Sequence, residues 1–372
     1  MRFEFATAQR VIFGEGAVKE VPVAARAFGN RAILVRGSSP DRAAALRIAL
    51  EAAGVHCVEF VVAGEPTVDL IRSAPRQADL VIAIGGGSVL DAGKAVAALI
   101  ANPGDPMDYL EVIGKGQPLA RTAAPCIAIP TTSGTGSEVT RNAVLGSPEH
   151  RVKASMRSAS MLPRIAVVDP ELTLGLPRGI TASTGLDALT QLIEPYLSVK
   201  ANPITDALCV QGIPHAARAL PVLWDEPGNR PARSEMSFAS LLGGMALANA
   251  GLGAVHGFAA PIGGMFPAPH GAVCAALLPH ALEVNSQASQ DTTRFNHVAR
   301  LVTGDSAATA QDGVRWIAEL CRKLEIPPLR TYGITESDLP SIVEKASQAS
   351  SMKGNPVPLS AEQLHQIVSR AL

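Results

Sequence analysis

The stretch LVIAIGGGSVLDAGK, residues 80–94, decides the fold of the N-terminal half of the chain. An apolar run typical of a buried strand leads directly into three glycines at 85–87, and a helical pattern continues through residues 89–100. Because glycines lack a Cβ, the backbone can approach a ligand closely, and a helix N-terminus offers unpaired N–H groups to a phosphate. The stretch therefore predicts either a phosphate-binding turn or a plain strand-to-helix turn with Ser88 as the N-cap.

The segments on either side repeat this alternation of strand and helix. We expect strands at 31–37, 55–62, 80–86 and 125–132. A helix is expected at 41–54, where the helical spacing ends in a glycine. Strands that alternate with helices are typical of an α/β sheet with parallel pairing.

The second half of the chain has a different pattern, because strand-like runs become scarce after about residue 177. Long Ala- and Leu-rich segments predict helices at 182–198, 203–219, 233–251, 256–265, 271–284, 291–303, 308–324, 336–349 and 360–371. Proline and glycine residues at 171–179 mark the boundary between the two patterns. We therefore predict two domains: an α/β domain at residues 1–177 and an all-helical domain at residues 178–372.

Composition limits the classes of function. The 372 residues are 47% apolar and 17% charged, as expected for globular domains with sizeable cores. A net charge of -1 without basic clusters argues against nucleic acid or an anionic membrane as a partner. Five scattered cysteines form no CxxC pair, so we expect small core residues rather than disulfides or a thiolate zinc site. We see no signal peptide and no apolar stretch long enough to cross a bilayer, and so expect a cytoplasmic protein.

A second polar loop, PTTSGTGSEVT at residues 130–140, also follows an expected buried strand. Six of its residues carry hydroxyl groups, which offer donors to phosphate, ribose or amide groups. Taken alone, it could be an ordinary polar loop. Two such loops after two strands instead point to one crevice at the carboxyl ends of a sheet, where a nucleotide would bind.

The helical half contains a candidate set of metal ligands. Asp187 and Gln191 are four residues apart, so they share one face of an expected helix. His256 and His270 are each followed by glycine and embedded in apolar sequence. Separately, Asp187 could be a charge at a helix start and the histidines could be satisfied core residues. As a group, carboxylate and imidazole ligands suit Zn²⁺ or Fe²⁺.

In these motifs the chain resembles the iron-containing (group III) alcohol dehydrogenase family, which shares its fold with glycerol dehydrogenase and dehydroquinate synthase. The resemblance runs over nearly the whole chain, through VIFGEGAV, IGGGSVLDAGKA, PTTSGTGSEVTRNAV, VVDPELT, GLDALTQLIEPYLS, ASLLGGMALANAGLGAVHG and PHGAVCAALLPH. It implies a Rossmann-like N-terminal domain, a helical C-terminal domain and an active-site cleft between them.

The resemblance also implies the site residues. The cofactor, NAD or NADP, would contact Gly86, Gly87, Ser88, Asp91, Thr131, Thr132, Thr135, Ser137, Val139, Lys153 and Leu172. A divalent metal, Fe²⁺ or Zn²⁺, would bind Asp187, Gln191, His256 and His270. The substrate would be a small alcohol or aldehyde, and the family commonly forms dimers or larger homo-oligomers.

Three positions depart from the family pattern. The second metal position is usually histidine, but here it is Gln191, whose neutral amide is a weaker ligand. A further histidine that often follows four residues after the first cleft histidine is replaced by Ala260. The acid that selects the cofactor after the first strand is missing, and Gly37 stands near that point with Arg36 and Ser38 beside it. Because no carboxylate would repel a 2′-phosphate, NADP is expected to be tolerated.

The resemblance implies a catalytic role for Asp187, His256 and His270, which would hold a Lewis-acidic metal beside the substrate oxygen during hydride transfer. Two alternatives stay open. One is a lyase of the dehydroquinate-synthase kind, which uses NAD transiently. The other is a catalytically altered member of the family with a weakened metal site, acting on an unusual carbonyl compound or only binding the cofactor, as Gln191 and Ala260 suggest.

Overall fold

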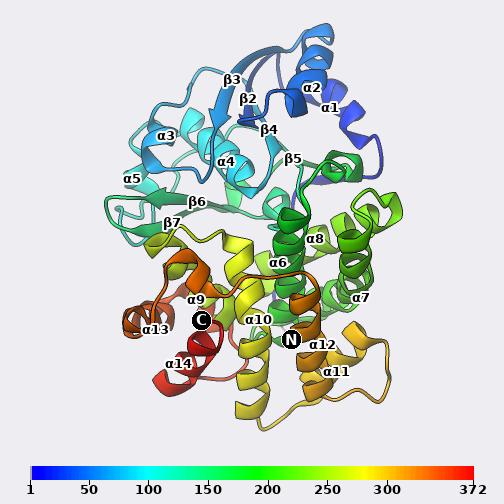
Figure 1. Ribbon diagram of the computed structural model, residues 1–372. Helices are drawn as coiled ribbons and strands as arrows, with labels where there is room; N and C mark the ends of the chain where they lie inside the picture. Colours follow the sequence, from blue (N-terminus) through cyan, green and yellow to red (C-terminus); the bar gives the residue numbers. More distant parts are fainter. Residues whose placement is uncertain (1) are drawn as a thin grey trace. The chain divides into compact units, whose positions relative to one another are not determined.

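The N-terminal half of the chain forms a six-stranded sheet in the computed structural model, which describes residues 2–372. Neighbouring strands run parallel, in the order β1-β8-β5-β4-β2-β3 (Figure 1). The strands are β1 (Arg10–Phe13), β2 (Arg31–Gly37), β3 (His56–Val62), β4 (Leu80–Gly85), β5 (Cys126–Pro130) and β8 (Ile165–Val168). Since β3 lies on one side of β2 and β4 on the other, the direction of winding reverses between β2 and β4. Open α/β sheets bind ligands beyond the carboxyl ends of the strands at such a reversal.

Helices cover both faces of this sheet, which explains why its central strands β2, β4, β5 and β8 are largely buried on both sides. The helices are α1 (Val21–Arg26), α2 (Asp41–Ala52), α3 (Val68–Arg72), α4 (Gly87–Ala101) and α5 (Pro106–Tyr109). On β2, Ile33 and Val35 belong to the core beneath α3 and α4. Ala32 and Leu34 point the other way, into the core beneath α1 and α2. Burial of both faces is typical of parallel sheets.

An antiparallel hairpin was not predicted from the sequence. Its strands are β6 (Asn142–Ser147) and β7 (Val152–Arg157), which form a separate two-stranded sheet. Leu145 of β6 and Met156 of β7 are buried in the same core as α4. The short strands β1 and β8 were also missed, whereas the four longer parallel strands lie where the sequence predicted them.

The C-terminal half is helical and contains no strand within residues 174–372. Its helices are α6 (Arg178–Leu197), α7 (Pro203–Asp225), α8 (Arg230–Ala250), α9 (Ala254–Met265), α10 (His270–Ala288), α11 (Thr293–Thr303), α12 (Ala310–Lys323), α13 (Leu339–Gln348) and α14 (Ala361–Arg370). Their apolar faces pack into a single core that includes Leu189 of α6, Phe258 of α9 and Leu277 of α10. The predicted fold class, an α/β N-terminal part followed by an all-helical C-terminal part, is confirmed.

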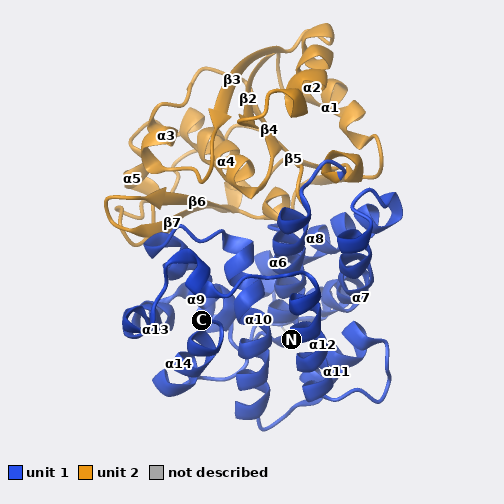
Figure 2. Cartoon of the chain, viewed as in Figure 1, with its two compact units in different colours: residues 1–6, 133–135, 174–372 blue, residues 7–132, 136–173 orange. Residues whose placement is uncertain are grey.

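Contacts within the chain define two compact units (Figure 2). Residues 7–132 and 136–173 form the α/β unit, which contains the sheet and the hairpin. Residues 1–6, 133–135 and 174–372 form the helical unit. The hydroxyl-rich loop at 130–140 therefore contributes residues to both units.

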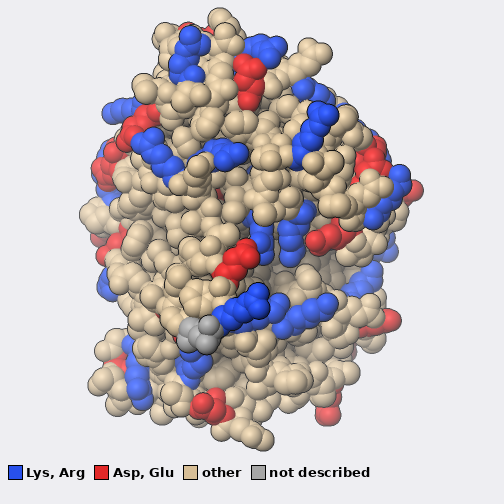
Figure 3. Space-filling view, turned by 180° about the vertical axis from the view of Figure 1, so that it is seen from behind, with Lys and Arg blue, Asp and Glu red and all other residues tan. Residues whose placement is uncertain are grey.

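Two surface properties bear on possible partners. Across residues 2–372, no single helix combines the length and apolar composition needed to span a bilayer; α8 and α9 together would pass that test, but they are bent by 96° relative to each other. On the face shown in Figure 3, Lys and Arg side chains are spread out and interspersed with Asp and Glu. This distribution agrees with a net charge of -1.

Candidate functional site

The triple-glycine turn joins β4 to the N-terminus of α4. Gly86 is the N-cap of α4, has extended backbone angles and provides no side chain to cap the helix. A Cβ on Gly85 would lie 2.6 Å from Cβ of Val89, so the turn has no room for a larger residue there. The first N–H groups of a fifteen-residue helix therefore remain free of a side-chain cap at the end of a buried strand. This arrangement suits a phosphate group.

A cavity of about 330 Å³ opens beside this turn, at the reversal between β2 and β4. It is lined by Arg36, Gly37, Ser38, Ser39, Arg42, Ala43, Ile84, Gly85, Gly86, Val89 and Thr131. None of these residues carries a carboxylate. The Nη2 atom of Arg36 lies 2.6 Å from Oε2 of Glu59, so that cation is already paired. Arg42 forms no ion pair with any residue in 2–372, and its charge is free to meet an anion.

The two predicted loops are joined by hydrogen bonds. The amide of Thr131 donates to the carbonyl of Gly85 at 2.9 Å. The hydroxyl of Ser137 donates to Oδ1 of Asp91 at 2.5 Å, and the fully buried Lys94 donates to the carbonyl of Ser137 at 2.9 Å. Asp91 and Ser137 thus bind each other and hold the hydroxyl-rich loop against α4.

The remaining residues predicted to contact a cofactor occupy varied environments. Thr132 lies close to Gly86, because a Cβ built on that glycine would be 3.5 Å from Cγ2 of the threonine. Val139 is fully buried. On β7, Nζ of Lys153 lies 3.2 Å from Oε1 of Glu65. The half-buried Leu172 packs beneath α1 and α2, and Thr135 belongs to the segment that groups with the helical unit.

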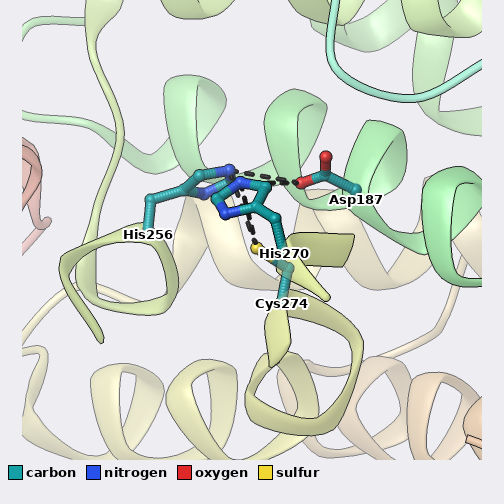
Figure 4. A group of neighbouring side chains, drawn as sticks. All are labelled: Asp187, His256, His270 and Cys274. Atoms are coloured by element: carbon teal, nitrogen blue, oxygen red, sulfur yellow. Dashed lines mark hydrogen bonds and ion pairs between the residues drawn. The ribbon is translucent and has the colours of Figure 1, made fainter. Parts of the chain in front are cut away.

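Three of the predicted metal ligands converge within the helical unit (Figure 4). Asp187 comes from α6, His256 from the first turn of α9, and His270 is the first residue of α10. The Nε2 atom of His256 lies 3.3 Å from Oδ1 of Asp187, and Nε2 of His270 lies 3.8 Å from the same oxygen. The three side chains therefore point at a common centre.

A fourth donor in this cluster was not predicted. Cys274 follows His270 by one helical turn on α10, and its Sγ lies 3.7 Å from Nε2 of that histidine. The ligand atoms of Asp187, His256, His270 and Cys274 all lie within 4.8 Å of one another. We had expected the cysteines to be core residues, since a lone cysteine in an apolar helix gives no sequence signal of ligation. Its spacing of four residues from His270 is the one signal that could have identified it.

The buried oxygens of α6 fit a cation. Asp187 and Gln191 are 1% and 3% exposed, and neither Oδ1 of Asp187 nor Oε1 of Gln191 has a hydrogen-bond partner within residues 2–372. The 3.3 Å approach of His256 to Asp187 is thus a close contact without hydrogen-bond geometry. Buried acceptors are almost always satisfied, so each of these two oxygens, one turn apart on α6, calls for a bound cation or donor. The residues present therefore fit a divalent metal.

Glu194 supports this cluster and was also missed by the sequence analysis. Its Oε2 accepts a hydrogen bond from Nδ1 of His256 at 2.7 Å, and its Oε1 accepts one from the amide of Val255 at 2.7 Å. With Nδ1 occupied as a donor, Nε2 of His256 keeps a lone pair directed at Asp187. Glu194 lies seven residues after Asp187 and so shares its helical face, a spacing that could have flagged it.

The charges of the cluster are strongly coupled. Burial raises the pKa of Asp187, but the neighbouring His270 and His256 outweigh burial and the pKa is lowered overall. Burial lowers the pKa of His270, yet Cys274 and Asp187 raise it to about 8. Burial also lowers the pKa of His256, yet Cys274 and the two carboxylates raise it above its usual value. The cluster thus stabilises positive charge at its centre.

Ala260 stands one turn after His256 on α9 and is half-buried. A methyl group can neither exchange a proton nor coordinate a metal. Any proton transfer therefore has to use another group.

Comparison with known proteins gives matches over nearly the whole chain. The profile of the family described as "Iron-containing alcohol dehydrogenase" matches residues 8–170, and that of the "Fe-containing alcohol dehydrogenase family, C-terminal" matches residues 181–372. Alcohol dehydrogenase 4 of Saccharomyces cerevisiae is 37% identical over 297 residues, which cover 80% of this chain and 76% of that protein.

Solved structures match as well. The crystal structure of a 1,3-propanediol oxidoreductase superposes with a TM-score of 0.93 and 32% identity, covering 100% of both chains. The sulfoacetaldehyde reductase of Bifidobacterium kashiwanohense, solved in complex with NAD⁺, superposes with a TM-score of 0.89 and 28% identity, covering 99% of this chain and 98% of that one.

Proposed function

Because the chain belongs to the iron-containing alcohol dehydrogenase family, we propose that its helical unit holds the divalent metal and its α/β unit holds the nicotinamide cofactor. The protein is a metal-dependent alcohol dehydrogenase, an oxidoreductase that acts on CH–OH groups. The observation that carries the proposal is the convergence of Asp187, His256 and His270 on one buried centre. We propose residues 1–177 as the cofactor-binding domain and residues 178–372 as the metal- and substrate-binding domain.

The proposed metal ligands are Asp187, His256 and His270, with Gln191 as a weaker oxygen donor. When bound, a divalent cation acts as a Lewis acid that lowers the pKa of a substrate alcohol. Asp187 supplies negative charge in a site where burial strengthens electrostatic attraction. Glu194 fixes the tautomer of His256 and thereby keeps its Nε2 available.

Access to the centre is through His270. Its side chain is 33% exposed, whereas those of His256 and Asp187 are 6% and 1% exposed. Because His270 is the most exposed of the three, we propose that a small alcohol or aldehyde enters past it. Substrates such as a short diol or a small aldehyde suit this access and agree with the names of the matched proteins.

For the cofactor, we propose that Gly86, Gly87 and Ser88 bind the pyrophosphate at the N-terminus of α4. When bound there, a nicotinamide would supply a hydride acceptor for an alcohol or a hydride donor for a carbonyl compound. The other proposed contacts are Asp91, Thr131, Thr132, Thr135, Ser137, Val139, Lys153 and Leu172. Asp91 and Ser137 shape the loop through their mutual hydrogen bond, and Thr131 and Thr132 lie beside the glycines.

We further propose that the protein accepts NADP in preference to NAD. The cavity beside the glycine turn is lined by Arg36, Arg42 and two serines and contains no carboxylate. Arg42 is unpaired and can meet a 2′-phosphate, whereas an acid at this position would repel it. The proposed metal is Fe²⁺ or Zn²⁺, and a homo-oligomeric assembly and a cytoplasmic location stay predictions.

Ala260 and Gln191 favour a second candidate, an altered member of the family that acts on an unusual carbonyl compound such as a keto acid. Its metal site would be weaker and its proton transfer rerouted. A screen of NADPH- and NADH-dependent turnover with alcohols, aldehydes and keto acids separates this candidate from an ordinary alcohol dehydrogenase. A lyase of the dehydroquinate-synthase kind would show no net cofactor turnover in the same screen.

The metal role is tested with His256→Ala, after elemental analysis has verified one bound metal per parent chain. We expect kcat to fall at least about 100-fold, because Lewis-acid stabilisation is worth several kcal/mol. Cofactor affinity, followed by fluorescence titration, should stay unchanged. His215→Ala on α7 is the matched control, since that histidine bonds only to groups outside the cluster. An unchanged kcat in His256→Ala would refute the metal role.

A further inference from the structure

The cluster contains more donor atoms than the family pattern supplies. Cys274 is fully buried, and its Sγ lies 3.8 Å from Nε2 of His256 and 3.7 Å from Nε2 of His270. Figure 4 shows the thiol directed at the same centre as the two imidazoles and Asp187. Within residues 2–372 the sulfur of Cys274 has no backbone carbonyl partner, whereas that of Cys321 donates to the carbonyl of Ala275.

These separations match those between ligands of one metal ion. In a tetrahedral Zn²⁺ site with bonds of about 2.0–2.3 Å, two N or O ligands lie roughly 3.3 Å apart and an S and an N roughly 3.6 Å apart. The observed distances are 3.3 and 3.8 Å for the N–O pairs and 3.7 and 3.8 Å for the S–N pairs. These four separations exceed the tetrahedral values by no more than about 0.5 Å, and all the ligand atoms of the cluster lie within 4.8 Å of one another.

The charge balance also favours the thiol. A buried divalent cation held by Asp187, two neutral histidines and the neutral amide of Gln191 would leave one positive charge uncompensated. A Cys274 thiolate as a further ligand gives two anionic ligands and a neutral site, and the neutral amide of Gln191 does not alter this balance. Because burial penalises uncompensated charge, the ligand set that includes the thiolate is the more stable one in this buried site.

We propose that the Cys274 thiolate is a metal ligand that takes over the role of the histidine replaced by Gln191. The resulting set of one carboxylate, two imidazoles and one thiolate selects Zn²⁺ over Fe²⁺, because Zn²⁺ binds such mixed sites more tightly and accepts tetrahedral geometry. This inference rests on the proposed function, since it places the ligand in the same metal centre. It also replaces our expectation that no cysteine of this chain binds zinc.

The test uses the full-length protein loaded with Co²⁺, whose bond to a thiolate gives an intense charge-transfer band in the near ultraviolet. The parent should show this band together with the weaker visible bands of tetrahedral Co²⁺. Cys274→Ser should lose the near-ultraviolet band. The matched control, Cys209→Ser, alters a cysteine that is equally buried on α7 and should keep the band.

Metal affinity provides a second readout. Competition with a chelator should show that Cys274→Ser weakens Zn²⁺ binding by at least the roughly 10–100-fold that loss of an outer-shell partner costs. The double variant Cys274→Ser/Gln191→His restores a histidine to α6 and should recover tight binding without the near-ultraviolet band. Recovery of tight Zn²⁺ binding in the double variant would show that Cys274→Ser loses affinity because a ligand is missing, and not because the fold is less stable.

The possible failures are distinguishable. A parent that binds no Co²⁺ or Zn²⁺ would overturn the metal centre itself and with it the proposed function. A parent that binds one Co²⁺ without the near-ultraviolet band would overturn only the proposal that Cys274 is a ligand. This test uses the parent protein and does not depend on whether a variant folds. A band that persists in Cys274→Ser would likewise contradict the assignment.

Discussion

The Nδ1 atom of His256 lies 2.7 Å from Oε2 of Glu194, and both side chains are buried. Glu194 uses its other oxygen to accept the amide of Val255, so one carboxylate fixes both the start of α9 and the orientation of its imidazole. The relationship joins α6 to α9 at the point where the proposed metal ligands converge.

Replacing this carboxylate by an amide should weaken the metal site. Glu194→Gln retains one acceptor for two donors, so either His256 or Val255 loses its hydrogen bond. We expect Zn²⁺ affinity to fall roughly 10–100-fold, as for other partners of metal-bound histidines. Chelator competition measures the change, with the surface variant Glu283→Gln as the control. Equal affinities in Glu194→Gln and the parent would show that the orientation of His256 does not depend on Glu194.

Cofactor preference should reverse when an acid is placed in the cavity beside β2. Gly37→Asp is sterically feasible, because a Cβ there would meet only Cγ2 of Val89, at 3.9 Å. The new carboxylate would repel a 2′-phosphate and accept bonds from a free ribose. We expect the ratio of kcat/KM for NADPH to that for NADH to fall roughly 10–100-fold, or about 1.4–2.8 kcal/mol.

Gly175→Asp provides the control for that experiment, since position 175 also has open space but lies outside the cavity. Arg42→Gln should lower kcat/KM with NADPH and leave that with NADH unchanged. A parent enzyme that already prefers NADH would contradict the assignment of the cavity to a 2′-phosphate.

Stability should depend on pH through Glu138 in the hydroxyl-rich loop. Burial raises the pKa of this carboxyl from 4.5 to about 7, despite the opposing effects of a backbone hydrogen bond and Lys94. Between these values the folded state binds more protons than the unfolded state, so the free energy of unfolding falls as the pH rises. The loss amounts to roughly 3 kcal/mol and is complete above pH 7.

Chemical denaturation of the parent and of Glu138→Gln at several pH values between 4 and 8 measures this effect. As the pH rises, the free energy of unfolding of the parent should fall relative to that of Glu138→Gln, because the glutamine does not titrate. Glu111→Gln alters an exposed carboxyl paired with Arg157 and serves as the control. If the free energies of unfolding of the parent and of Glu138→Gln change with pH in the same way, the pKa of Glu138 is not raised in the folded protein.

Much of the fold could be predicted because its signals are local. The strands β2, β4 and β5 are largely buried and apolar, and the alternation of strands with helices identifies a parallel sheet. The strands β1 and β8 have only four residues each, too few to show a period. The hairpin was missed because β6 and β7 bury only every second residue, and the buried ones include small alanines.

The candidate site was only partly predictable because it depends on convergence in space. Asp187, His256 and His270 were identified from their surroundings and from family resemblance, yet no spacing could place three different helices around one point. Cys274 was interpreted as core because it lies in an apolar helix, and Glu194 was not considered as a candidate. Their roles become visible only when α6, α9 and α10 are packed together.

Close packing of α4 on the sheet should make Gly93 intolerant of substitution. A Cβ at this position would lie 2.5 Å from Cβ of Ala83 on β4. We expect Gly93→Ala to lower the free energy of unfolding by about 1–3 kcal/mol, the usual cost of overpacking. Gly179→Ala on α6, where the added methyl meets open space, should be neutral or stabilising. Denaturant titrations of both variants compare the two sites, and a neutral Gly93→Ala would show that α4 can shift away from β4.

The central claim is that one divalent cation binds the buried cluster of the helical unit. Anomalous diffraction from crystals grown with Zn²⁺, recorded above and below the zinc edge, tests it most directly. The account predicts a single strong peak about 2.0–2.3 Å from the ligand atoms of Asp187, His256 and His270. The absence of a peak there, with the three side chains turned to separate places, would contradict it.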